Sequence, residues 1–232
     1  TEIDMVTTPD GSPVAMVHSN NGASELDAWV GWFADFARLV GAEVSVPAIY
    51  EALYNHALTG AVDAGGVMAY NTLSAESLVG QEAAQPVFTH SPDARVTLAN
   101  AMRAQLMSVF AAVRIGVDIL REEGVGLDSL FAHGGLFKTP GVAQQILADS
   151  LNISVSVGDT AGEGGAWGIA VLARYRALLA AGESGLTLPA YLSERVFAGA
   201  SVSTLDPSPE GAAGYERFLS SYRASLPGVE VL

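Results

Sequence analysis

Two glycine-rich loops hold the residues of this sequence that are best placed for chemistry. Gly134-Gly135 follows a short apolar run and precedes a helical pattern, with Lys138 and Thr139 close behind. Glycines at such a turn let another molecule approach the backbone, and the next helix N-terminus offers free amides and a partial positive charge. Lys138 adds charge, and Thr139 is a candidate cap for a helix from residue 140. A planar base or a phosphate would fit this loop, and a tight turn without a ligand is the alternative.

The second loop, residues 159–168, contains Glu163 among several glycines. A carboxylate near the start of the following helix is stabilised by the helix dipole, so Glu163 fits either a structural role or a ligand site. His133 borders the first loop, and the alternative for it is a histidine satisfied within that loop. The histidines show no metal-ligand spacing, and we expect no metal site. Neither a P-loop pattern nor a nucleophile elbow is present in the sequence.

The elements that must position these loops follow from hydrophobic period and from turn residues. Ser24 is a candidate cap for the first helix, with Asp27 as its capping-box partner. Residues 73–92 are expected to be irregular. The expected elements are a hairpin at 3–18, helices at 24–40 and 47–58, a strand at 67–70, one long helix at 97–121, a strand at 129–132, a helix at 140–151, a strand at 153–157, and helices at 166–181 and 215–225.

This order of elements predicts a single α/β domain over residues 1–232. Strands separated by helices favour parallel pairing, and an antiparallel hairpin on the same sheet would make that sheet mixed. In such sheets ligands bind beyond the carboxyl ends of the parallel strands. Both glycine-rich loops fall there, so we expect them to border one site.

Composition narrows the function classes. Lys plus Arg is 11 and Asp plus Glu is 25, which gives a net charge of −14. Nucleic-acid binding is not expected, because phosphate contacts need clustered basic residues. The chain has no cysteine, which fits a reducing, cytoplasmic compartment. No apolar run approaches the roughly 20 residues of a membrane span, and no signal peptide is recognisable. A start without Met on a strand-like run predicts a fragment of a longer protein.

The residues around the first loop resemble the adenosine motif of the FGGY family of carbohydrate kinases. The matching stretches cover roughly residues 1–180. Residues 2–11 are similar to the ribulokinase-like branch, and residues 63–76 to the segment that leads into the family's Gly-Glu-Arg loop. The other matches are Ala132-His133-Gly134-Gly135-Leu136-Phe137-Lys138-Thr139, Gln145-Ile146-Leu147-Ala148-Asp149, Glu163-Gly164-Gly165-Ala166-Trp167-Gly168-Ile169-Ala170 and, on the long helix, Asn100-Ala101-Met102-Arg103-Ala104.

The resemblance implies an actin-like (ribonuclease H-like) ATPase domain with a mixed sheet flanked by helices. FGGY kinases have two such domains, with ATP between them. This chain resembles the C-terminal one, with the N-terminal domain and the first strand expected before Thr1. The catalytic base belongs to the N-terminal domain, so no catalytic residue is expected here. The nucleotide-binding residues that the resemblance and the loops together suggest are Gly134 and Gly135 against the adenosine, Thr139 and Gln144 as polar contacts, and His133, Lys138 and Glu163 beside them.

The implied activity is transfer of the γ-phosphoryl group of Mg-ATP to a ketose such as ribulose or xylulose. The partners would be the sugar and the N-terminal kinase domain, and this chain alone is expected to be inactive. Three departures leave the sugar open: Gln144 and Gln145 compete for one role, Met107 replaces a usual Glu, and Ser77 replaces a usual Arg. The alternatives are an actin-like ATP-binding interaction module that does not phosphorylate sugar, and a structural domain. A homo-oligomer, paired through an exposed edge near residues 3–6, also stays open.

Overall fold

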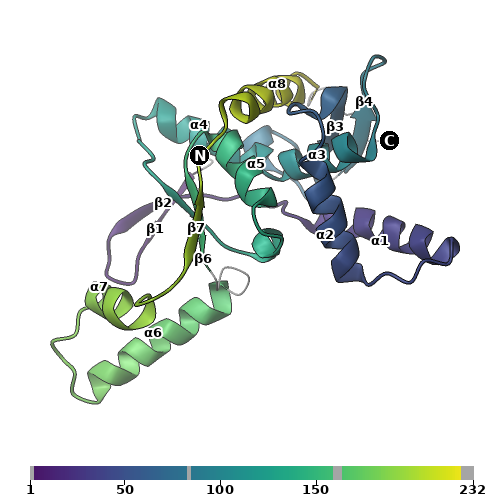
Figure 1. The fold of residues 1–232 in the computed structure, drawn as a ribbon. Helices are drawn as coiled ribbons and strands as arrows, with labels where there is room; N and C mark the ends of the chain where they lie inside the picture. The colour runs from purple at the N-terminus through teal and green to yellow at the C-terminus, as the bar shows by residue number, and fades with distance from the viewer. Residues whose placement is uncertain (1–2, 83–84, 159–163, 226–232) are drawn as a thin grey trace.

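The computed structural model describes residues 3–82, 85–158 and 164–225 (Figure 1). The strands are β1 (Ile3–Thr7), β2 (Pro13–Val17), β3 (Val67–Tyr70), β4 (Val87–His90), β5 (Leu130–Ala132), β6 (Val155–Gly158) and β7 (Val202–Leu205). The α-helices are α1 (Ser24–Leu39), α2 (Val46–Ala57), α3 (Leu98–Val109), α4 (Ala111–Glu122), α5 (Val142–Leu151), α6 (Gly164–Ala180), α7 (Leu188–Tyr191) and α8 (Pro209–Ser225).

The sheet that leads to the first glycine loop has the order β5-β6-β7. Strands β5 and β6 are parallel, with Ala132 opposite Val157, which confirms the expected pairing across a helix. Strand β7 is antiparallel to β6 and makes the sheet mixed. The expectation that the hairpin would supply the antiparallel strand is wrong, because β1 and β2 pair only with each other among the described residues. No clear signal for β7 is present in the sequence, because its residues are mostly exposed and several helical segments separate it from β6.

The predicted hairpin is confirmed, and it rests on α4. Its turn closes through a hydrogen bond of 2.9 Å from the Gly11 amide to the Thr8 carbonyl. At the other end, Val17 lies against Gly116 of α4. A Cβ atom on Gly116 would come within 2.3 Å of a Val17 methyl group, so this contact requires a glycine.

A second small sheet joins the predicted strand at residues 67–70 to a strand inside the segment 73–92, which was expected to be irregular. Strand β4 pairs antiparallel with β3, from Val67 opposite His90 to Tyr70 opposite Val87. All four residues of β3 are buried, whereas β4 is half-buried and follows Pro86. The prediction of an irregular segment is therefore wrong for β4. Strand β4 was not recognised because it is short and follows a proline, and because it forms by pairing with the buried strand β3.

The single long helix expected over residues 97–121 is two helices, and this expectation is corrected. Phe110 ends α3 and precedes α4 with φ −93° and ψ −3°, and its amide bonds the Met107 carbonyl at 3.2 Å. That bond spans three residues instead of four, so the helix tightens and turns there. Neither Gly nor Pro marks the position in the sequence. Helix α3 is buried from Ala99 to Val109 and forms the centre of the core.

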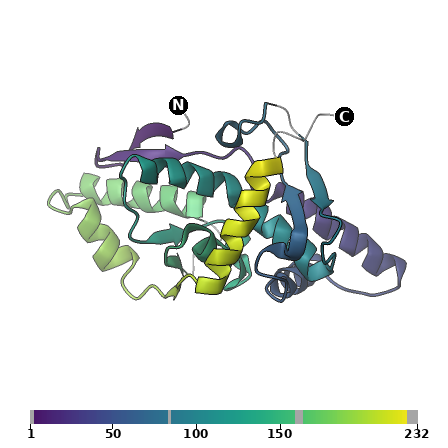
Figure 2. The same ribbon diagram turned by 90° about the horizontal axis from the view of Figure 1, so that it is seen from above.

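Helix α8 closes the core from the C-terminal side (Figure 2). It begins at Pro209, earlier than the predicted residue 215. Gly214 lets it approach closely, because a Cβ atom there would lie 2.6 Å from the Val62 carbonyl oxygen. The large side chains that α8 buries are Tyr215, Phe218, Leu219 and Tyr222.

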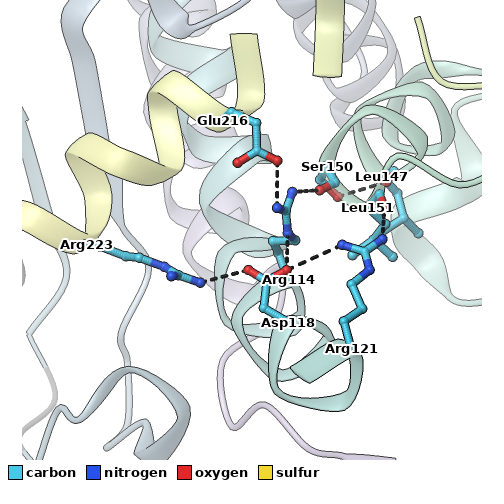
Figure 3. Close-up of polar contacts among 8 residues, drawn as sticks. All are labelled: Arg114, Asp118, Arg121, Leu147, Ser150, Leu151, Glu216 and Arg223. Carbon is cyan, nitrogen blue, oxygen red and sulfur yellow. Dashed lines mark hydrogen bonds and ion pairs between the residues drawn. The ribbon is translucent and has the colours of Figure 1, made fainter. Parts of the chain in front are cut away.

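A cluster of ion pairs centred on Arg114 joins α4, α5 and α8 (Figure 3). The Arg114 guanidinium donates to the Ser150 carbonyl at the end of α5, at 2.5 Å, and pairs with Asp118 at 2.8 Å. It also pairs with Glu216 of α8, at 2.6 Å. Arg223 reaches Asp118 from α8 at 2.8 Å, and Arg121 donates to the Leu151 carbonyl. The Arg114 side chain is 10% exposed and Asp118 is 22% exposed, so solvent screens the contact between these two side chains less than it screens a surface pair.

The buried tyrosines make the stability of the fold sensitive to alkaline pH. Burial raises the pKa of Tyr54 to about 12, and it raises the pKa of Tyr70 and Tyr222 as well. An unfolded tyrosine loses its proton near pH 10, whereas these folded ones keep theirs. The free energy of unfolding is therefore at its full value below pH 10 and falls above it, by about 1.4 kcal/mol per pH unit between pH 10 and 12 for Tyr54. Tyr70 and Tyr222 add to the loss in the same direction.

Urea unfolding at a series of pH values measures this loss. Tyr54→Phe should remove one tyrosine's share of the slope between pH 10 and 12. A free energy of unfolding that stays constant over this range would contradict the assignment.

Candidate functional site

A cavity of about 730 Å³ lies between the first glycine loop and the N-terminal parts of α1 and α2. One wall is the backbone and side chains of the segment that follows β5. The other two walls are helical and carry polar and aromatic side chains. The lining residues are Gly135, Leu136, Lys138, Thr139 and Pro140 on the loop, Ala23, Ser24 and Asp27 at the start of α1, and Val46, Pro47, Tyr50, Glu51 and Tyr54 at α2.

Gly134 sets the direction of the loop wall. It has φ +117° and ψ 170°, a region of backbone conformation that is essentially restricted to glycine. The chain then makes a 3-10 turn, Gly135–Lys138, in which the Phe137 amide bonds the Gly134 carbonyl at 3.1 Å. A Cβ atom on Gly135 would meet nothing within 4 Å. The backbone at Gly135 is therefore open to a molecule in the cavity.

The structure brings three of the predicted site residues to this cavity: Gly135, Lys138 and Thr139. Gly134 shapes the loop just before it. His133 is exposed and is not among the lining residues. The expectation that Thr139 caps the next helix is wrong, since α5 begins at Val142 after a left-handed Gly141 and has no side-chain cap.

Gln144, predicted as a polar contact of the nucleotide, is only 3% exposed and lies away from the cavity. Its Nε2 atom donates to the Val155 carbonyl at 2.8 Å and to the Ser203 carbonyl at 2.9 Å. The neighbouring Gln145 donates to Asp149 at 2.9 Å and to the Asp206 carbonyl at 3.0 Å. In this structure both side chains hold β7 and the segment after it in place.

Glu163 lies outside the described residues, so its place beside the first loop stays a prediction. Strand β6, which leads into the second loop, has the parallel pairing on which that prediction depends. Strands β5 and β6 run parallel and end at the same edge of the sheet, where Ala132 is opposite Val157.

Sequence reasoning missed the helical walls of the cavity. Ser24 and Asp27 were interpreted as a capping box, but the N-cap of α1 is Ala23 and no side chain caps it. Their side chains instead line the cavity, together with Tyr50 and Tyr54 one turn apart on α2. Short polar residues at a helix start and tyrosines at i and i+4 were the available signals. Their meaning depends on how α1 packs on α2, which no local pattern fixes.

A hydrogen bond across the two helices fixes the polar wall. The Tyr50 hydroxyl donates to the Asp27 carboxylate. Burial, followed by this contact with Asp27, raises the pKa of Tyr50 above its ordinary value, and burial raises that of Tyr54 to about 12. Both hydroxyls are therefore protonated near neutral pH. The Asp27 carboxylate is exposed enough to accept a further hydrogen bond from a bound molecule.

Among residues 3–82, 85–158 and 164–225, no group of three or more His, Asp or Glu side chains is arranged to hold a metal ion. Over the same residues, no helix is both long and apolar enough to cross a bilayer.

Comparison with known protein families identifies the family of the domain that contains the loop and its cavity. The family model of the FGGY carbohydrate kinases, C-terminal domain, matches residues 1–177. The chain belongs to the FGGY family of carbohydrate kinases. This places the glycine loop and both helical walls within the family domain. No curated protein matches the chain in a search of such sequences.

Solved structures of FGGY kinases share the fold. A ligand-bound xylulose kinase from Lactobacillus acidophilus gives a TM-score of 0.69 at 16% identity, over 98% of this chain and 43% of that one. A xylulose kinase from Rhodospirillum rubrum gives 0.64 at 22% identity, over 88% and 38%. A gluconate kinase from Lactobacillus acidophilus gives 0.65 at 16% identity, over 98% and 42%. The predicted fold class, an actin-like α/β domain, is confirmed. The chain spans about two fifths of the length of these kinases.

Proposed function

We propose that this chain is the nucleotide-binding half of an ATP-dependent sugar kinase, with ATP seated in the cavity beside Gly135. The observation that carries the proposal is the open backbone at Gly135, which faces a cavity large enough for an adenosine group. Drug-sized ligands bind in cavities of about 300–1,000 Å³ with apolar walls and a few polar groups. The volume of this cavity falls in that range, and Val46, Pro47 and Leu136 give it apolar lining beside its polar side chains.

The walls suggest how the nucleotide is held. The base lies between the loop backbone and the tyrosines of α2, whose rings favour stacking with a flat partner. The Asp27 carboxylate accepts a hydrogen bond from an exocyclic amino group, which adenine has and hypoxanthine lacks. Lys138, on the loop, adds positive charge for the phosphates. Gln144 serves this site indirectly, by fixing β7 against the sheet that carries the loop.

Mg²⁺ and the catalytic base come from outside this set of side chains. Bound Mg²⁺ usually keeps several waters and takes one or two carboxylates plus the phosphate oxygens of the substrate. Its ligands are therefore expected from ATP and from the N-terminal kinase domain that partners this chain. A base on the attacking hydroxyl and in-line positioning are also needed for phosphoryl transfer, and the same domain would supply them. Closure of the two domains would exclude water from the reaction.

The proposed substrate is a ketose such as xylulose or ribulose, phosphorylated in the cytoplasm. Support comes from the xylulose kinases among the structural relatives and from the ribulokinase-like opening of the sequence. The gluconate and glycerol kinases among the relatives are the competing substrate classes.

A coupled assay of ADP release tests the proposal. The chain joined to its N-terminal domain is assayed with Mg-ATP and with xylulose, ribulose, gluconate and glycerol in turn, and this chain alone is assayed in parallel. We expect sugar-dependent ADP release from the joined protein and none from this chain. Nucleotide binding without any sugar-dependent turnover would instead favour an ATP-binding interaction module. Sugar phosphorylation by this chain alone would contradict the proposal that the N-terminal domain supplies the catalytic base.

A further inference from the structure

Two turns that are far apart in the sequence are tied together just before α1. The first, residues 19–21, lies in the connection from β2 to α1, and the second, residues 74–76, follows β3. The Ser74 amide donates to the Asn21 Oδ1 atom at 2.9 Å, and the Asn21 Nδ2 atom donates back to the Ser74 carbonyl at 3.0 Å. The Asn20 Nδ2 atom donates to the Ala75 carbonyl at 2.9 Å. These contacts fix the position of the first turn relative to the second.

The side chain of Glu76 is the centre of this contact. It is 1% exposed, and its Oε2 atom accepts hydrogen bonds from the Ser19 hydroxyl and the Asn20 amide, both at 2.8 Å, and from the Asn21 Nδ2 atom at 3.1 Å. The Glu76 backbone is itself held by Gln81, since the Glu76 amide donates to the Gln81 carbonyl at 2.8 Å and its carbonyl accepts from the Gln81 amide at 3.0 Å. Hydrogen bonds to a carboxylate are stronger than those to a neutral acceptor, so Glu76 holds the turn 19–21 firmly.

The turn 19–21 helps to set where α1 begins. The helix lies at one end of the molecule (Figures 1 and 2), and no side chain caps its N-terminus. The residues that α1 buries share one face and are Leu26, Val30 and Ala34. The start of α1 is therefore positioned by this one face and by the turn that Glu76 binds.

The start of α1 also forms one wall of the cavity beside Gly135. Ser24 and Asp27 line that cavity, and Asp27 lies in the first turn of the helix. Its carboxylate is the acceptor proposed above for the exocyclic amino group of adenine. A shift of the helix start by about 1 Å would take this carboxylate out of hydrogen-bond range of the base. The geometry of the turn 19–21 is therefore coupled to recognition of the base.

We propose that Glu76 is a positioning residue for adenine specificity: it holds the turn 19–21 and thereby places the Asp27 carboxylate against the base. The inference rests on the nucleotide site proposed above. Glu76 is not among the residues that line the cavity, so it acts through the turn and does not touch the nucleotide. Loss of its carboxylate should weaken binding of ATP more than binding of ITP, whose hypoxanthine base lacks the amino group that Asp27 would bind.

Calorimetric titration with non-hydrolysable analogues of ATP and ITP, on the chain joined to the proposed N-terminal domain, tests the inference. The parent protein should bind the ATP analogue about tenfold more tightly than the ITP analogue. Glu76→Ala should weaken the ATP analogue about tenfold and leave the ITP analogue within about threefold, so that the preference is lost. In the assay of ADP release, the KM for ATP should rise while kcat at saturating ATP stays within about twofold.

Rescue by the conservative variant separates the role of the carboxylate from that of the side-chain volume. Glu76→Gln keeps one oxygen acceptor for the turn 19–21. Its amide nitrogen takes the place of the Oε1 atom, which is buried and has no hydrogen-bond partner among the described residues. This variant should therefore recover part of the preference for ATP, to a value between those of the parent and Glu76→Ala.

Tyr215→Phe is the matched control. It removes a buried hydrogen bond, of 2.8 Å from the Tyr215 hydroxyl to the Met107 carbonyl, between α8 and α3, and should leave the ratio of the two affinities unchanged. Circular dichroism checks that each variant is folded. Should Glu76→Ala fail to fold, Asn21→Ala replaces it, because this half-buried side chain bonds both Glu76 and Ser74 and its loss should lower the preference in the same direction.

The outcomes separate this inference from the proposed function. Equal weakening of both analogues, or an unchanged preference for ATP, in the Glu76 and Asn21 variants would overturn the role of Glu76 and leave the nucleotide site standing. A parent protein that binds neither analogue would overturn the nucleotide site and this inference with it. A parent that binds both analogues equally would overturn the contact of Asp27 with the base, and again the inference.

Discussion

Arg114→Met should lower the free energy of unfolding by about 3 kcal/mol. The guanidinium is the common partner of the Ser150 carbonyl, Asp118 and Glu216, and its side chain is only 10% exposed. Methionine keeps much of the apolar stem but removes every donor. The Ser150 carbonyl at the end of α5 would then lose its buried donor. The Asp118 carboxylate would keep only Arg121 and Arg223, and α8 would lose one of its two ion-pair anchors on α4.

Urea unfolding of Arg114→Met and of a matched control, Arg38→Met, measures the effect. Arg38 pairs with Asp35 at 2.6 Å, but both side chains are at least 70% exposed. Exposed pairs contribute about 0–1 kcal/mol, so the control should change stability by less than about 1 kcal/mol. Equal losses in the two variants would show that burial of the Arg114 cluster adds nothing to the fold.

Gly135→Leu should abolish nucleotide binding, with an affinity loss of at least about 100-fold, or about 2.7 kcal/mol. Gly135 lines the cavity, and its missing side chain faces open space, so leucine fits the folded chain and occupies the place of the ligand. Gly185→Leu is the control, because Gly185 also has open space around it and lies in the connection between α6 and α7.

Calorimetric titration with a non-hydrolysable ATP analogue, on the chain joined to the proposed N-terminal domain, compares the two variants. Thermal unfolding should show both to be as stable as the parent protein. Retained affinity in Gly135→Leu would mean that the nucleotide does not lie against this loop. Gly134→Ala adds a separate measure, because alanine is strained at φ +117° and should cost about 1–3 kcal/mol of stability.

Local patterns in the sequence predicted the elements whose signals are local. The hairpin turn at Gly11, the glycine break before β3 and the parallel pair β5–β6 follow from turn chemistry and element order. Strands β4 and β7 were missed because each is short and depends on pairing with a buried neighbour. The break at Phe110 was missed because no glycine or proline marks it.

The residues of the candidate site were likewise predictable only where their signals are local in the sequence. The loop residues Gly135, Lys138 and Thr139 were predicted from a local pattern, a glycine pair between a strand and a helix, and they line the cavity. Their contact with a nucleotide stays a prediction. Asp27 and Tyr50 were not predicted, since they meet only when α1 packs on α2. The resemblance named Gln144, whose side chain is buried and donates to the Val155 carbonyl in this structure, so a direct contact of Gln144 with the nucleotide stays a prediction.

The packing of α8 on the core determines where the chain can be truncated. The family match ends at residue 177, whereas Tyr215, Phe218 and Tyr222 fill the centre of the molecule and Glu216 completes the Arg114 cluster. A truncation at residue 177 would remove α8, expose the apolar residues against which it packs, and take the Glu216 carboxylate away from Arg114. Such a truncated domain should aggregate, so expression boundaries for this domain belong beyond Ser225, not at the end of the family match.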